Sequence, residues 1–171
     1  MKSRKRQLAR LSGSRAGHSD TGAFEAASEA WDSGQLRPAF RLFSIAARNG
    51  DRGAQLNLGL FYQNGIGVRA NNALAMVWYR RAYRKGDASA ANNIGLMFLG
   101  RGDTRRARAW LERAVKAGND DSRLHLAEIS IANGRKTEAI SHLTKLKDSR
   151  TATRESTRLA REKLRRLKHA L

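Results

Sequence analysis

The sequence contains no cysteine and a single proline, and both shortages narrow what the chain can be. Without cysteine there is no disulfide framework, no thiolate metal ligand and no cysteine nucleophile, and nothing indicates an oxidising compartment. Proline breaks helices, whereas straight-chain residues lose little rotamer freedom in them, so a chain rich in alanine, leucine and arginine favours helix over strand. We therefore expect an all-helical, cytoplasmic protein.

Long hydrophobic runs are also missing. No stretch approaches the roughly 20 apolar residues that a membrane span needs. The basic residues at the start of the chain are not followed by the apolar core of a secretory signal. We expect a soluble protein with no membrane span. An organellar transit peptide stays open as an alternative, because the first basic, serine-containing residues carry no acid before Asp20.

Acidic residues are few, with 15 against 34 lysines and arginines and a formal net charge of +19. Such an imbalance creates a positive field that attracts polyanions and acidic proteins. The excess is concentrated in residues 1–22, 51–86 and 148–171. The charge therefore predicts an acidic partner, either a protein or a nucleic acid.

The two ends of the chain differ from its middle. Residues 1–22 are basic and rich in serine and glycine, with too few large apolar residues to offset the entropy of ordering, so we expect a disordered arm. Residues 148–171 form an amphipathic pattern, with Leu159, Leu164, Leu167 and Leu171 near one stripe and basic residues over most of the rest. We expect this helix to cap the fold; a basic helix that binds a partner or a membrane surface is the alternative.

Between the ends, residues 23–147 consist of helical stretches separated by glycine-containing turns. The pattern occurs four times, over residues 23–50, 51–86, 87–119 and 120–147. Ala75, Trp78, Ala82 and Gly86 recur as Ala107, Trp110, Ala114 and Gly118. Two antiparallel helices need small residues where they approach most closely and large residues beside them. Gly59 and Gly95 are the small residues. The repeat predicts an α-solenoid of four helical hairpins with one continuous core, in which Asp103 caps a helix and Pro38 lies in the first turn of another.

The second hairpin carries a family resemblance. Its characteristic residues are Ala54, Leu58, Gly59, Tyr62, Gly65, Gly67, Val68, Ala75, Trp78, Tyr79, Ala82 and Gly86. This run resembles a Sel1-like repeat, a relative of the tetratricopeptide repeat, and the third hairpin resembles the shorter tetratricopeptide form because it lacks the glycine-containing insertion. The resemblance weakens in the first and fourth hairpins. It implies a right-handed superhelix that acts as an adaptor or scaffold and binds a protein partner.

The resemblance also implies binding residues. In related tetratricopeptide domains, an asparagine two positions before the helix glycine faces the concave surface and hydrogen-bonds the backbone of a bound peptide. Asn57 and Asn93 stand at that position, while Glu25 and His125 replace them in the outer hairpins. A carboxamide donates and accepts at once, which suits capture of an extended peptide. The alternative is that both asparagines are solvated or bonded to neighbouring helices.

Basic residues provide two further candidate sites. Arg80, Arg81 and Arg84 are candidates for selecting an acidic peptide, although their place on a second helix leaves open a convex position or a merely solvated face. The other candidate is non-specific nucleic-acid binding by the arm and the C-terminal helix, with steep salt dependence. Its residues are Lys5, Arg6, Arg10, Arg158, Arg161, Arg165 and Arg166. Neither segment interleaves aromatic residues for base stacking.

No chemistry of a catalytic or metal site is visible. The four histidines are scattered without ligand spacing, and His142 occupies the repeat position of Trp78 and Trp110, so we expect it to pack. The glycines at 65 and 67 follow no strand and precede no phosphate-loop lysine, so a turn is expected there. We predict a non-catalytic interaction adaptor with no cofactor and no metal. The sequence leaves the oligomeric state and the partner's identity open.

Overall fold

The computed structural model describes residues 21–169, so the predicted disordered arm lies outside the described residues except at its last two positions. The described part of the chain forms nine α-helices and no strand. Their bounds are α2 Thr21–Asp32, α3 Leu36–Arg48, α4 Arg52–Asn64, α5 Asn72–Arg84, α6 Ala88–Leu99, α7 Thr104–Lys116, α8 Ser122–Ala132, α9 Lys136–Lys147 and α10 Arg154–His169.

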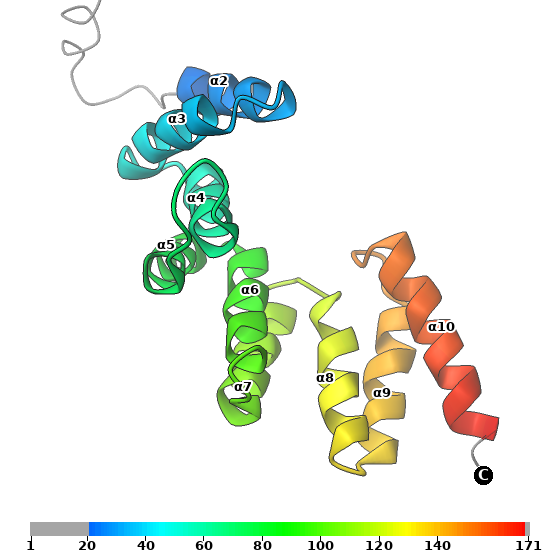
Figure 1. The fold of residues 1–171 in the computed structure, drawn as a ribbon. Helices are drawn as coiled ribbons and strands as arrows, with labels where there is room; N and C mark the ends of the chain where they lie inside the picture. Colours follow the sequence, from blue (N-terminus) through cyan, green and yellow to red (C-terminus); the bar gives the residue numbers. More distant parts are fainter. Residues whose placement is uncertain (1–20, 170–171) are drawn as a thin grey trace, which may run out of the picture.

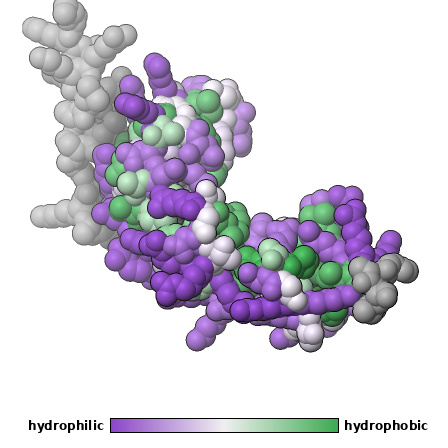
Figure 2. All heavy atoms as spheres, turned by 60° about the horizontal axis from the view of Figure 1, so that its bottom comes forward, coloured by the Kyte–Doolittle hydropathy of each residue, from purple (hydrophilic) through white to green (hydrophobic). Residues whose placement is uncertain are grey.

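Consecutive helices pair as hairpins that stack into an arc, and α10 lies along α9 (Figure 1). In the first two hairpins, α2 and α4 lie nearer the inner side of the arc than α3 and α5, whereas α6 and α7 overlap in this view (Figure 1). By its place in the repeat, α6 is the equivalent of α2 and α4, and we treat it as an inner helix. Figure 2 shows the same arc from another side, hollowed at the bend and mostly hydrophilic on the visible surface. The predicted α-solenoid of four hairpins with a C-terminal helix is confirmed.

Several helices begin at an acidic cap. The Asp51 carboxylate accepts a hydrogen bond from the Ala54 amide at 2.6 Å, and Asp87 caps α6 in the same way. The predicted cap at Asp103 is confirmed, since its carboxylate accepts from the Arg106 amide at 2.9 Å. Each cap satisfies an amide that has no partner inside its helix.

Close packing within the hairpins depends on glycine, as the repeat pattern predicts. A Cβ atom at Gly59 would lie 2.5 Å from two carbons of the Tyr79 ring, and one at Gly95 would lie 2.8 Å from Leu111 Cγ.

Gly67, in the turn between α4 and α5, has a φ of +65° and lies against the Leu36 carbonyl, where a Cβ would be only 2.3 Å from the oxygen. The insertion therefore docks the second hairpin onto the first.

The C-terminal helix is an integral part of the solenoid. Ala160 and Leu164 are buried against the apolar side of α9. Hydrogen bonds fix the connecting loop to the two residues just before α8: Asp120 accepts from the Ser149 hydroxyl at 2.6 Å, and Asp121 accepts from the Thr153 amide at 2.9 Å. Of the predicted leucine stripe, Leu159 and Leu167 pack half-buried against the same cluster, and Leu171 lies outside the described residues. This packing supports the capping role for the helix.

Candidate interaction surfaces

The inner helices α4 and α6 present a largely uncharged surface to solvent. Among their accessible residues, only Arg52 at the start of α4 carries a charge. The remainder are mainly leucines and amides that are half-buried: Leu56, Asn57, Leu60 and Gln63 on α4, and Asn92, Asn93, Leu96 and Leu99 on α6. Such a surface combines apolar contact area with hydrogen-bonding groups, as peptide-binding grooves do.

The two predicted asparagines differ in their surroundings. Asn93 is hydrogen-bonded to the hydroxyl of Tyr79 on the preceding hairpin, and that hydroxyl donates to Gln63 Oε1 at 2.7 Å. Burial raises the pKa of Tyr79 to about 12, against a smaller opposing effect of the Asn93 bond, so the phenol stays protonated and keeps donating. Asn57 is half-buried, and its side chain makes no hydrogen bond within residues 21–169.

A cleft of about 190 Å³ opens beside this network, between the second and third hairpins. It is lined by Gln63, Asn72, Leu96, Met97, Gly100 and Arg101. Gln63 thus joins the buried Tyr79 to the wall of the cleft. Sequence reasoning missed the cleft because Gln63 and Arg101 lie at the ends of two different helices.

Arg80, Arg81 and Arg84 are exposed on α5, which is an outer helix (Figure 1). The structure does not bring these three arginines beside the asparagines of the inner face. The guanidinium carbon of Arg81 lies 4.5 Å from the centroid of the Trp78 ring. The same stacking recurs on α7, where Arg113 lies over Trp110, so Arg81 and Arg113 contribute to packing of the outer surface through cation–π contacts. The spacing of three residues between tryptophan and arginine in both repeats was the sequence signal for these contacts.

The basic residues of α10 fall into two groups. Arg158 pairs with Glu155 at 2.6 Å, and Arg166 with Glu162 at 2.5 Å. In contrast, Arg161 and Arg165 have no ion pair with any described residue.

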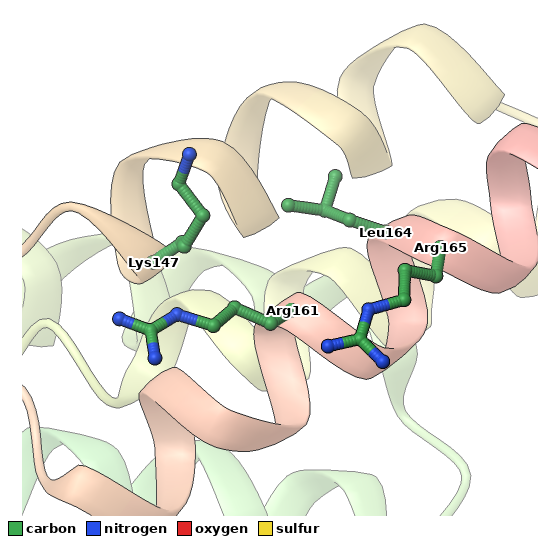
Figure 3. A pocket seen from close by; sticks show the side chains of 4 residues that line it. All are labelled: Lys147, Arg161, Leu164 and Arg165. Carbon is green, nitrogen blue, oxygen red and sulfur yellow. The ribbon is translucent and has the colours of Figure 1, made fainter.

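These two arginines line a cleft of about 230 Å³ together with Leu164 and with Lys147 from the end of α9 (Figure 3). The other predicted polyanion-binding residues, Lys5, Arg6 and Arg10, lie outside the described residues.

A charged network connects the third and fourth hairpins. Arg108 on α7 forms ion pairs with Glu112, at 2.9 Å, and with Glu138 on α9. Arg108 lowers the pKa of Glu138 to about 2, chiefly through the hydrogen bond. His142, one turn further along α9, is half-buried; its Nδ1 has no partner in the described part of the chain, and burial lowers its pKa. Sequence reasoning did not find the Arg108–Glu138 pair because the two residues lie 30 positions apart.

Among the described residues, no group of three or more histidine or acidic side chains could hold a metal ion. None of the helices between residues 21 and 169 is both long and apolar enough to cross a membrane.

Comparison with known families agrees with this architecture. The Sel1 repeat matches residues 35–51 and 53–87, and the tetratricopeptide repeat matches residues 92–152. The chain is therefore a Sel1-like and tetratricopeptide-like repeat protein, which confirms the resemblance seen in its sequence. Repeats of these families are general protein–protein interaction scaffolds and are typically non-catalytic.

Individual relatives cover the chain to different extents. Chitin synthase regulatory factor 4 of Schizosaccharomyces pombe is 36% identical over 99 residues, which are 55% of this chain and 16% of that protein. A Sel1 repeat protein from Oxalobacter formigenes is 27% identical with a TM-score of 0.55, over 64% of this chain and 47% of that one. The MamA protein shares the fold at 19% identity, with a TM-score of 0.57 over 85% of this chain and 84% of its own. The chain thus spans less than a fifth of the curated relative.

Proposed function

We propose that this protein is an adaptor that holds an extended segment of a partner protein along the inner face of the arc. The observation that carries the proposal is the largely uncharged surface of α4 and α6, where half-buried leucines and amides lie beside a cleft. An extended peptide exposes backbone groups that need hydrogen-bond partners and side chains that need apolar contacts. The regulatory factor among the relatives has a name that fits an adaptor role.

Asn57 and Asn93 have different roles in this proposal. Asn57 has no competing side-chain bond, so its carboxamide is available to donate to and accept from the peptide backbone. Asn93 is already engaged by Tyr79, and through that phenol it holds Gln63 at the wall of the cleft. We therefore assign backbone capture to Asn57 and a positioning role to Asn93.

The partner segment is proposed to place an apolar side chain in the cleft, against Leu96 and Met97, with an acidic residue near Arg101. The strongly positive chain would accelerate encounter with an acidic segment. Arg80, Arg81 and Arg84 would contribute to this long-range attraction from the outer surface. Nucleic-acid binding is the competing function.

The test is capture of partners by the tagged full-length chain from a nuclease-treated lysate, at low and high salt. An Asn57→Ala/Leu96→Ala variant removes one hydrogen-bonding group and one apolar contact of the inner face. We expect it to lose about 2 kcal/mol of binding free energy, or about thirtyfold in Kd. The matched control, Arg80→Gln/Arg84→Gln, alters the outer face and should retain the partner at high salt.

Two results would contradict the proposal. In one, the inner-face variant retains the captured protein as well as the unmodified chain does. In the other, only nucleic acid is captured, and it is released as the salt concentration rises. The second result would assign the function to the basic residues instead.

A further inference from the structure

The cleft between α9 and α10 is lined by basic side chains, two of which have no ion pair with the described residues, whereas three other basic side chains of α10 are paired. Arg158 and Arg166 each pair with a glutamate on the same helix, and Lys163 reaches Glu128 on α8 at 3.1 Å. Arg161 and Arg165 have no such partner between residues 21 and 169, and both line the cleft. Lys147 adds a third cation, whose only ion pair there is with the exposed Asp148 at 3.3 Å.

This arrangement places like charges close together. Arg161 and Arg165 stand four residues apart on one helix, and like charges at that spacing repel each other. Figure 3 shows the Arg161 and Arg165 side chains extending from α10, while the Lys147 side chain, at the end of α9, points away from the two guanidinium groups. An anion in the cleft would convert this repulsion into attraction.

The number and type of the cations point to phosphate. Arginine presents several N–H donors in a planar fork that matches phosphate oxygens, and lysine adds a point charge. Three cations complement a doubly charged phosphate better than a singly charged carboxylate. The cleft, at about 230 Å³, has room for a phosphate group with several waters, since each water occupies about 30 Å³ in the liquid.

We propose that this cleft binds a phosphate group, either as free phosphate or as a phosphomonoester of a small molecule. Arg161 and Arg165 donate to its oxygens, and Lys147 balances its charge from α9. Leu164 forms the apolar floor and fixes α10 against α9, so the site depends on the cap being docked. The site lies apart from the inner face of the arc, and the proposal does not depend on the adaptor function.

The experiment follows binding of inorganic phosphate and pyrophosphate to the full chain by the phosphorus NMR signal and by the arginine Nε–Hε signals. Chloride at equal ionic strength corrects for screening. We expect an Arg161→Gln/Arg165→Gln variant to bind phosphate at least about tenfold more weakly, because each substitution removes the charge-assisted hydrogen bonds that the arginine donates.

The matched control is Arg154→Gln/Arg158→Gln, which removes the same charge from the preceding turns of α10, outside the cleft. It should bind phosphate as the unmodified chain does, and far-UV circular dichroism of both variants should show an unchanged fold. A single-stranded oligonucleotide is titrated in parallel to detect a general polyanion surface.

The proposal is supported if Arg161→Gln/Arg165→Gln weakens phosphate binding and Arg154→Gln/Arg158→Gln does not, because binding is then confined to the cleft. Equal weakening by both double variants overturns the proposal, since α10 would then be a general polyanion surface of the kind that binds nucleic acid. Failure of phosphate and pyrophosphate to bind beyond the chloride baseline also overturns it.

Discussion

Replacing Gly59 by alanine should destabilise the fold, although alanine is the better helix former. The added Cβ would lie 2.5 Å from Cδ1 and Cε1 of Tyr79, well inside van der Waals contact. Tyr79 is fully buried, and its hydroxyl is held by Gln63 and Asn93, so the ring cannot turn aside without breaking hydrogen bonds. The conflict therefore falls on the packing of α4 against α5.

The two opposing effects can be compared in magnitude. Alanine in place of glycine favours a helix by about 1 kcal/mol, whereas overpacking a core costs about 1–3 kcal/mol. The neighbour here is the body of a fixed ring, so the cost lies in the upper part of that range. We expect Gly59→Ala to lower the free energy of unfolding by about 1–2 kcal/mol.

Urea denaturation followed by far-UV circular dichroism measures this loss, and two other glycines calibrate it. At Gly95 the added Cβ meets Leu111 side-chain atoms at 2.8–2.9 Å, a milder conflict. At Gly100, which ends α6 with a φ of −61°, the nearest atom is 3.6 Å away. The expected order of destabilisation is Gly59, then Gly95, with Gly100→Ala neutral or stabilising.

A double-mutant cycle isolates the contact itself. Tyr79→Leu removes the ring that the new methyl group would strike, so the two substitutions together should cost less than the sum of their separate effects. The reasoning is refuted if Gly59→Ala is as stable as Gly100→Ala, or if the cycle shows no coupling between the two positions.

Three further predictions concern the C-terminal half. Leu164→Ala should cost about 2–3 kcal/mol in urea denaturation, because the side chain is buried between the capping helix α10 and α9; a loss below about 1 kcal/mol would contradict the capping role. The Glu138–Arg108 pair lowers the carboxyl pKa to about 2, so its stabilisation is present above about pH 4.5 and fades toward pH 2. Glu138→Gln should therefore be less stable than the unmodified chain at pH 7 and indistinguishable from it near pH 2, and a difference independent of pH would argue against the pair. His142 should titrate below its ordinary pKa of 6.5 by NMR, because burial favours the neutral ring, so its contribution to stability is lost as pH falls below 6.5; a pKa at or above 6.5 would contradict its burial.

The sequence was sufficient to predict most of the fold. Glycines 59 and 95 predicted the close approach of paired helices, and the spacing of Trp78 and Trp110 gave the register of the repeat. These features repeat because each hairpin solves the same packing problem with the same small and large residues.

The candidate site was less predictable, because its contacts join residues that are distant in sequence. Gln63, Tyr79 and Asn93 come from three helices, and only the stacking of hairpins brings them together. The division of α10 into paired and unpaired arginines likewise depends on side-chain geometry and on the cleft with α9. Periodicity identifies a helix face, but it does not identify which side chains on that face find partners.

Site-specific photo-crosslinking tests the central proposal most directly. A photoreactive residue is placed either at Leu60, on the inner helix α4, or at Val77, which is exposed on the outer helix α5. After irradiation with the captured partner, the adaptor proposal predicts adducts from position 60 and few or none from position 77. Adducts formed equally at both positions, or only at position 77, would contradict binding on the inner face of the arc.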